Sequence, residues 1–314
     1  MAKGSSQECT QECTQICGLQ AGKAQRETRA AVISLLTGAL IWGLIWYPYR
    51  ILRDTGVDGV VASTATYAVA LVLGLAFFRR SLRAFSPSWP LFWLALAAGG
   101  CNLGYVLATL SGEVVRVLLL FYLAPLWTVL LSRLLLGERL NRFGVFVIAL
   151  SLAGAATMLW SPRAGLPLPQ DAADWLGLGA GFSFALLNVL SRRAQDATIE
   201  IKSMAAFVGV LFVGVLLILC GIGQPKMPAA PLAWLIVVLI GGVLVLANLV
   251  VQYGLARIAA NRAIVIMLSE VGIAALSSWL LADEALGLSE WVGGAMIVAA
   301  SVFSARMESA ERTP

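Results

Sequence analysis

The chain of 314 residues is 60% hydrophobic and only 12% charged, and its mean hydropathy of +0.86 excludes an ordinary soluble domain. It has a formal net charge of +5. The basic residues are distributed unequally between the two predicted sides of a membrane, so the charge is explained by membrane orientation and we expect no nucleic-acid partner. The chain contains no histidine, which excludes histidine metal ligation and histidine-based catalysis. We expect no metal, no cofactor and no enzyme activity.

The first 30 residues are polar and contain no apolar core, so they do not read as a cleaved signal peptide. We expect a disordered cytoplasmic tail. Cys9, Cys13 and Cys17 are spaced four residues apart, and acylation or metal binding on one helix face is the alternative to a solvated tail. On the reducing side of the membrane, we expect no disulfides.

Ten apolar stretches of roughly 20 residues follow, each long enough to cross the hydrocarbon layer as a helix. Only helices or closed barrels satisfy their backbone in lipid, and these stretches lack the alternation of barrel strands. The predicted fold is therefore an all-α membrane protein with ten transmembrane helices, at 31–52, 57–78, 89–110, 114–136, 143–160, 173–191, 203–222, 231–256, 262–282 and 288–306.

The lysines and arginines predict how these helices are oriented. If the N-terminus is cytoplasmic, 17 of the 22 basic residues lie on the cytoplasmic side, and the other five are Arg50, Arg53, Arg116, Arg163 and Lys226. By the positive-inside rule, both termini are expected in the cytoplasm.

The first span carries Trp42, Trp46 and Tyr49 at spacings of four and three, which places the three aromatic rings on one helix face. In the fourth span, Tyr122 and Trp127 also lie at mid-depth. Such rings could stack against a flat or cationic ligand, or they could pack in the core.

Glycine pairs occur in the third span, at Gly99 and Gly100, and in the eighth, at Gly241 and Gly242. Each pair could act as a hinge or allow close helix packing. Pro125 removes a backbone hydrogen bond in the fourth span and should kink it.

An internal repeat organises the chain: Asn102–Leu140 matches Asn248–Leu286 at an offset of 146 residues. A duplication explains the coincident polar residues better than chance between two hydrophobic hairpins. At this offset Pro125 is matched by Val271, so the second repeat lacks the proline kink of the first and the two halves are predicted to bend differently. The polar matches are Asn102 with Asn248, Arg116 with Arg262, Ser132 with Ser278 and Glu138 with Glu284.

A second offset, of 142, lays Trp42 on Phe184, Trp46 on Asn188 and Arg50 on Arg192. The repeats then cover 31–160 and 173–306, with a linker at 161–172 and a cytoplasmic tail at 307–314. Five spans is an odd number, so the second repeat must enter the membrane from the opposite side. Inverted repeats of this kind surround a substrate site near the midplane in many transporters.

Glu270 is the one acid predicted near the middle of the membrane. It could bind an ammonium group, exchange a proton, or form a structural hydrogen bond. Asn188 and Gln252 are the amides expected at a cavity. All four lysines are expected outside the spans, which argues against phosphorylated substrates.

The chain resembles the drug/metabolite transporter superfamily of EamA type. The resemblance is carried by Trp42-Gly43 in the first span, by Pro125 followed by Glu138 in LLGERL, and by Ser269-Glu270 and Ala282-Asp283-Glu284 in the repeat. The aromatic first span is similar to that of the aromatic amino acid exporters called YddG. One departure is Glu270-Val271, where the family has Glu-Pro.

The resemblance implies a secondary transporter in a bacterial inner membrane that exports small amphiphilic metabolites, chiefly amino acids and preferably aromatic ones. Cationic drugs or nucleotide sugars are alternative substrates, and a membrane binding or scaffold protein is an alternative without transport. The driving force and the oligomeric state stay open. The expected substrate-binding residues are Trp42, Trp46, Tyr122, Trp127, Phe184, Asn188, Gln252 and Glu270, and the expected hinge residues are Gly99, Gly100, Pro125, Gly241 and Gly242.

Overall fold

The computed structural model describes residues 25–83, 85–112, 114–159, 169–223, 231–282 and 287–303, and the regular structure of these residues is helical throughout. Eight helical segments are long and apolar enough to cross a membrane, and Arg142–Met158 and Trp291–Phe303 are shorter apolar helices. The predicted all-helical membrane fold is confirmed. Each of the ten predicted stretches overlaps one of these segments, but a crossing by the two shorter helices stays a prediction. Residues 1–24, the tail at 307–314, the linker at 161–168 and Glu284 lie outside the described residues, whereas residues 25–30, predicted as part of the disordered tail, are helical.

The first half begins with helical residues 25–44, which continue after Ile45 into α2, so that Gln25–Asp54 forms one long candidate span. Asp58 starts the next helix because its carboxylate accepts hydrogen bonds from the backbone N–H groups of Val60 and Val61. The helices of this half are α2 (Trp46–Asp54), α3 (Gly59–Phe77), α4 (Arg79–Leu82), α5 (Trp89–Ser111), α6 (Val114–Phe121), α7 (Ala124–Leu135) and α8 (Arg142–Leu159).

The second half begins at Asp171, whose side chain caps its first helix by accepting from the N–H of Asp174. Thr198 caps the following helix through the N–H of Ile201. The helices of this half are α9 (Ala172–Arg193), α10 (Ile199–Leu219), α11 (Pro231–Leu255), α12 (Ala260–Met267), α13 (Ser269–Ala282) and α14 (Leu288–Phe303).

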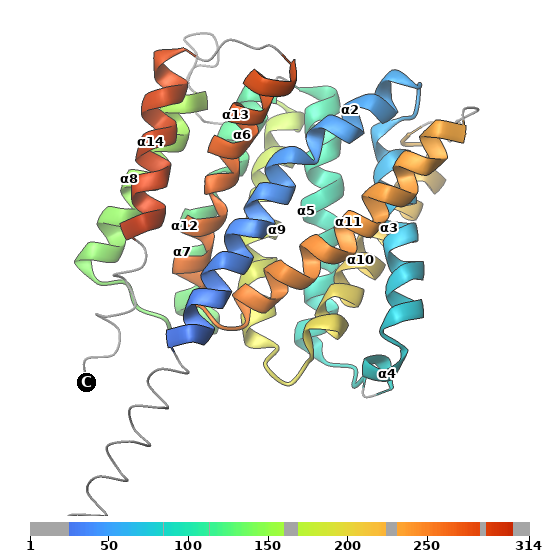
Figure 1. Cartoon of the computed structure of the whole chain (residues 1–314), viewed down its shortest axis with the longest axis horizontal. Coiled ribbons are helices and arrows are strands. Elements are labelled where there is room, and N and C mark those ends of the chain that lie inside the picture. The colour runs from blue at the N-terminus through green and yellow to red at the C-terminus, as the bar shows by residue number, and fades with distance from the viewer. Residues whose placement is uncertain are drawn as a thin grey trace, which may run out of the picture.

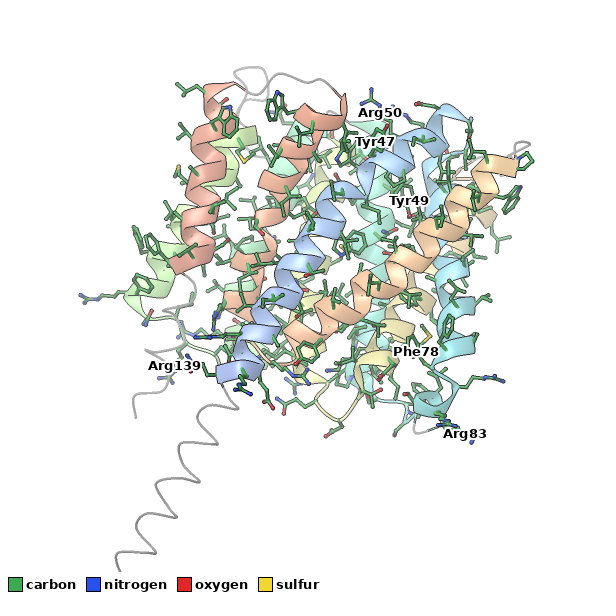
Figure 2. All side chains as sticks on the ribbon, in the orientation of Figure 1. Tyr47, Tyr49, Arg50, Phe78, Arg83 and Arg139 are labelled. Atoms are coloured by element: carbon green, nitrogen blue, oxygen red, sulfur yellow. The ribbon has the colours of Figure 1, made fainter. Side chains whose placement is uncertain are left out.

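Helices from the two halves pack against each other throughout the molecule. Helix α5 packs on α9 and α10, and α3 packs on α10 and α11. Helix α14 pairs with α8 at one edge of the molecule, on the left in Figure 1. Arg83 and Arg139 lie at the lower end of the helices in Figure 2, and Arg50 lies at the upper end. The halves therefore share one interior, with basic residues at both ends.

The predicted hinge glycines lie inside unbroken helices. A Cβ at Gly99 would stand 2.6 Å from the carbonyl oxygen of Gly209 on α10, and one at Gly241 would stand 3.1 Å from the carbonyl oxygen of Thr66 on α3. A Cβ at Gly100 would meet the Ser183 hydroxyl at 3.1 Å, whereas one at Gly242 would meet nothing within 4 Å. This geometry supports close packing at Gly99 and Gly241, and the hinge stays a prediction.

Two spans are interrupted at related positions. Helix α6 ends at Phe121 and α7 begins at Ala124, with Pro125 in its first turn. Helix α12 ends at Met267 and α13 begins at Ser269. The offset of 146 carries Tyr122 onto Leu268, the residue between α12 and α13. Both halves therefore contain a broken helix, although only the first break is made by a proline.

One expectation about the lysines is wrong. Lys202 lies inside α10 and is only 2% exposed. Its Nζ donates a 2.7 Å hydrogen bond to the carbonyl oxygen of Ser191, in the last turn of α9. A cation is favourable at a helix C-terminus, where carbonyl groups lack partners within the helix. This contact explains why a lysine is tolerated there.

Candidate functional site

Glu270 lies in the first turn of α13, just after the break at Leu268, and is half-buried. Every hydrogen bond and ion pair found among the described residues involves other groups, so within this part of the chain the Glu270 carboxylate has no polar partner. A carboxylate taken from water without a partner loses hydration that nothing replaces. Such a group is poised to bind a cation or a proton.

Three side chains lie within electrostatic range of the Glu270 carboxylate. Cys101 and Tyr105 come from α5, and Tyr122 comes from the break between α6 and α7. Cys101 and Tyr105 are four residues apart and therefore share a helix face. The first span approaches from another direction, where a Cβ at Gly43 would lie 3.1 Å from the Glu270 carbonyl oxygen.

Four aromatic rings form a group around Phe121, which we call the aromatic cluster: Tyr105, Phe121, Tyr122 and Phe184. The Phe121 ring centroid lies 5.3 Å from those of Tyr105 and Tyr122 and 5.5 Å from that of Phe184. Gly181 on α9 lets the Phe121 backbone approach closely, because a side chain there would meet the Phe121 carbonyl. Since Tyr105 and Tyr122 also lie within electrostatic range of Glu270, the cluster and the carboxylate make up one candidate site.

The predicted tryptophans are distributed more widely. Trp42 is half-buried and packs against two hydrophobic clusters, one on α3, α5, α10 and α11 and one around Leu35 and Met267. Trp46 donates a 2.9 Å hydrogen bond from Nε1 to the Ser277 hydroxyl, which ties α2 to α13. Trp127 meets Phe182 edge to face at 5.5 Å, outside the aromatic cluster. The Trp127 Nε1 has no hydrogen-bond partner among the described residues.

The two predicted amides differ in their surroundings. Asn188 is 2% exposed, and its Nδ2 has no partner within the described residues. It follows Phe184 by one helical turn on the same face of α9. Gln252 is equally buried but accepts a hydrogen bond from the Ser191 hydroxyl, about two turns along α9 from Phe184. Asn188 is therefore one helical turn from the aromatic cluster along α9, and Gln252 binds near the end of α9.

A family comparison identifies the class of protein that carries this site. The profile of the EamA-like transporter family matches the chain twice, over residues 29–160 and 171–306. The chain belongs to the EamA-like transporter family. This family consists of transporters, in agreement with the prediction that the chain is not an enzyme.

Several curated proteins resemble this EamA family member. RarD of Salmonella typhi is 25% identical over 175 residues, which are 54% of this chain and 57% of RarD. An uncharacterized transporter of Pseudomonas aeruginosa is 25% identical over 56% of this chain and 59% of its own length. An uncharacterized transporter of Archaeoglobus fulgidus is 29% identical over 62% of this chain and 68% of its own length. The matches to RarD and to the Pseudomonas protein thus span less than two thirds of those relatives.

A solved crystal structure has the same fold. It matches with a TM-score of 0.73 and 21% sequence identity, over 87% of this chain and 96% of its own. At this identity the likeness establishes the fold of the EamA family member and nothing about its substrate.

Sequence reasoning missed three members of the site, namely Cys101, Tyr105 and Phe121. The spacing of Cys101 and Tyr105 on one face of α5 was a usable signal, and Phe121 adjoins the predicted Tyr122. Asn102, which lies between the first two, instead bridges helices: it accepts a 2.6 Å hydrogen bond from the Ser63 hydroxyl on α3.

Proposed function

We propose that this EamA family member is a secondary transporter that exports small amphiphilic metabolites, most of all amino acids with aromatic side chains. Glu270 carries the proposal, because a half-buried carboxylate with no partner among the described residues suits a substrate ammonium group. An ammonium bound there would restore the charge balance that burial removes.

The aromatic cluster supports the choice of an amphiphilic substrate. Tyr105 and Tyr122 lie within electrostatic range of Glu270, and both rings contact Phe121, which in turn pairs with Phe184. Aromatic rings favour both cations and flat apolar groups. One end of an aromatic amino acid would thus meet the carboxylate while its ring meets the cluster.

Alternating access between two inverted five-helix repeats is the proposed mechanism. The double family match and the related helix breaks support a duplication. In Figure 1, α6 lies above α7 while α12 lies below α13, as expected for units of opposite orientation. A site between the repeats can face each side in turn. We propose cytoplasmic termini and a bacterial inner membrane, from the positive-inside rule and the bacterial relatives.

Within this mechanism Glu270, Tyr122, Phe184 and Asn188 are the leading substrate-binding residues. Trp42, Trp46, Trp127 and Gln252 remain proposed members of the wall of the substrate path, and the YddG-like subtype also remains a proposal. The experiment is transport of labelled phenylalanine and threonine by the purified protein in proteoliposomes. We expect flux of phenylalanine above that of threonine; a lack of flux for every amino acid would remove the substrate assignment.

Cationic drugs are the second candidate class, because the same carboxylate and rings suit a quaternary ammonium group. Nucleotide sugars are disfavoured, since their phosphates require cations near the site. Arg192, Lys202 and Arg262 instead lie in the first or last turns of their helices. Competition of phenylalanine flux by a quaternary ammonium compound or a nucleotide sugar separates these classes. Binding without flux would favour a scaffold protein.

A further inference from the structure

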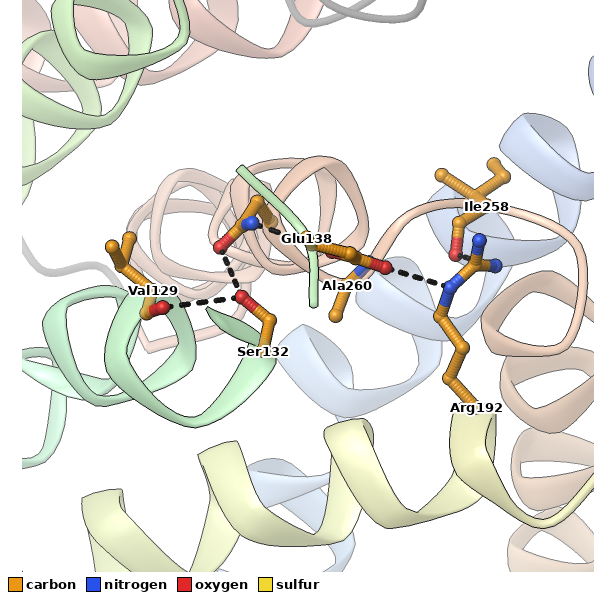
Figure 3. A network of polar contacts seen from close by, with 7 residues as sticks. Val129, Ser132, Glu138, Arg192, Ile258 and Ala260 are labelled. Carbon is orange, nitrogen blue, oxygen red and sulfur yellow. Dashed lines mark hydrogen bonds and ion pairs between the residues drawn. The ribbon is translucent and has the colours of Figure 1, made fainter. Parts of the chain in front are cut away.

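A second polar centre lies at the end of the molecule that bears Arg139. Glu138, in the segment between α7 and α8, accepts hydrogen bonds from three groups (Figure 3). Arg192 Nε donates at 2.8 Å, the backbone N–H of Ala260 at 3.1 Å, and the Asn261 side-chain amide at 3.3 Å. With side-chain exposures of 13% for Glu138 and 26% for Arg192, this ion pair is largely shielded from water.

Each hydrogen bond that Glu138 accepts joins the two halves of the chain. Glu138 belongs to the first range of the family match, and Arg192, Ala260 and Asn261 belong to the second. Further bonds reinforce the junction: Ser132 Oγ to Asn261 Oδ1 at 3.1 Å, and Arg193 Nη1 to the Leu135 carbonyl at 2.6 Å. If the halves rock against each other, this junction must open and close.

The bonds are of a kind that can be made and broken. The Glu138 carboxylate sits at the first residue of α12, where backbone N–H groups lack intrahelical partners and favour a negative charge. Arg192 adds a charge-assisted bond and also donates from Nη1 to the Ile258 carbonyl at 2.6 Å. Hydrogen bonds to charged groups contribute modest net free energies, so the closed arrangement can be favoured without being permanent.

Helix α12 connects this centre to the candidate site. All eight of its residues, from Ala260 to Met267, are buried, and its end is followed by Leu268, Ser269 and Glu270. Its length is about 12 Å, at roughly 1.5 Å per residue. A short, fully packed helix moves as a unit, so displacement of its N-terminus would be transmitted to the turn that carries Glu270.

We propose that Glu138, Arg192 and the N-terminus of α12 form a latch that closes the path between Glu270 and the Arg139 end of the molecule. This inference rests on the proposed alternating-access function, for which it names the closing device on one side. Release of Glu138 from α12 and Arg192 opens that side.

Cys101 provides a native reporter, because it is half-buried, unpaired, and within electrostatic range of Glu270. The other four cysteines are replaced by serine, and the labelling rate of Cys101 by a membrane-impermeant thiol reagent is measured in sealed vesicles from either side. A separate protein carrying Arg139→Cys identifies the side that bears the latch. The assay uses no substrate, so its result does not depend on whether the protein transports amino acids.

We expect Glu138→Gln and Arg192→Gln each to raise the labelling rate from the latch side by at least about tenfold, the factor that corresponds to loss of a hydrogen bond to a charged group. Arg139→Gln is the matched control, since Arg139 is exposed and adjacent, and should leave the rate unchanged. Arg192→Lys keeps the positive charge and is less disruptive to folding than Arg192→Gln. We expect it to raise the labelling rate of Cys101 less than Arg192→Gln does. The proposal is overturned if the rate is unchanged in all three latch variants, or if Arg139→Gln raises it equally.

Discussion

Glu138 and Glu270 are two shielded carboxylates that differ in their hydrogen-bond partners. Glu138 accepts hydrogen bonds from Arg192, from a helix N-terminus and from an amide. Glu270 is half-buried within electrostatic range of Tyr105 and Tyr122, and it lacks a polar partner in the described part of the chain. A satisfied carboxylate stabilises the packing of the helices it joins. An unsatisfied one destabilises the empty protein and can be retained for a ligand. The contrast supports the two proposals, closure by Glu138 and substrate binding by Glu270.

The largest expected effect comes from Glu270→Gln, which keeps the shape of the side chain and removes its charge. Transport of labelled phenylalanine in proteoliposomes should fall at least about tenfold, because a charge-assisted bond to the ammonium is lost. Asp196→Asn removes a negative charge from an exposed loop and is the matched control. Equal transport by wild type and Glu270→Gln would end the assignment of Glu270 to the substrate.

In thermal unfolding in detergent, replacement of the two glutamates by glutamine should change the stability of the protein in opposite directions. Glu138→Gln removes a charge that three donors stabilise, so the free energy of unfolding should fall by about 1 to 3 kcal/mol. Glu270→Gln removes a charge with no compensating partner, so the substrate-free protein should become more stable. A loss of stability in both variants would mean that Glu270 has a structural role like that of Glu138.

Selectivity should depend on the aromatic cluster. Replacement of Phe184 by leucine keeps an apolar side chain but removes the ring that pairs with Phe121. We expect the ratio of phenylalanine to threonine flux to fall by about 2- to 10-fold, the range of an aromatic contact. Phe146→Leu, at an exposed ring of α8 outside the cluster and the proposed substrate path, is the comparison; an equal fall there would show that the effect is not local.

The smallest effects concern the glycines of α11. Gly241→Ala should lower the unfolding temperature, because a Cβ would crowd Val69 and the Thr66 carbonyl. Gly242→Ala should be neutral or slightly stabilising, since nothing lies within 4 Å and alanine is the better helix former. Transport measured on the same two variants tests the hinge: impaired flux in Gly242→Ala with unchanged stability would favour bending over packing.

The sequence predicted the features that depend on local composition. The length of the apolar stretches predicted the helical segments, and a single acidic residue within such a stretch pointed to Glu270. Both signals can be read from consecutive residues. The break after α12 was not expected, since no proline stands there. Lys202 was assigned outside the spans because the predicted span began at residue 203; its partner, the Ser191 carbonyl, belongs to another helix and could not be read from the local sequence. Tyr105 and Phe121 were missed for the same reason: their importance arises from the approach of α5, α6 and α9.

The most direct test of the central claim is competition against phenylalanine flux by two analogues that each lack one charged group. Phenethylamine keeps the ammonium, and 3-phenylpropionate keeps the carboxylate. If Glu270 binds the ammonium, phenethylamine should compete at least about tenfold more strongly in the wild type, and this advantage should vanish in Glu270→Gln. Stronger competition by 3-phenylpropionate, or an amine advantage that persists in Glu270→Gln, would contradict the account.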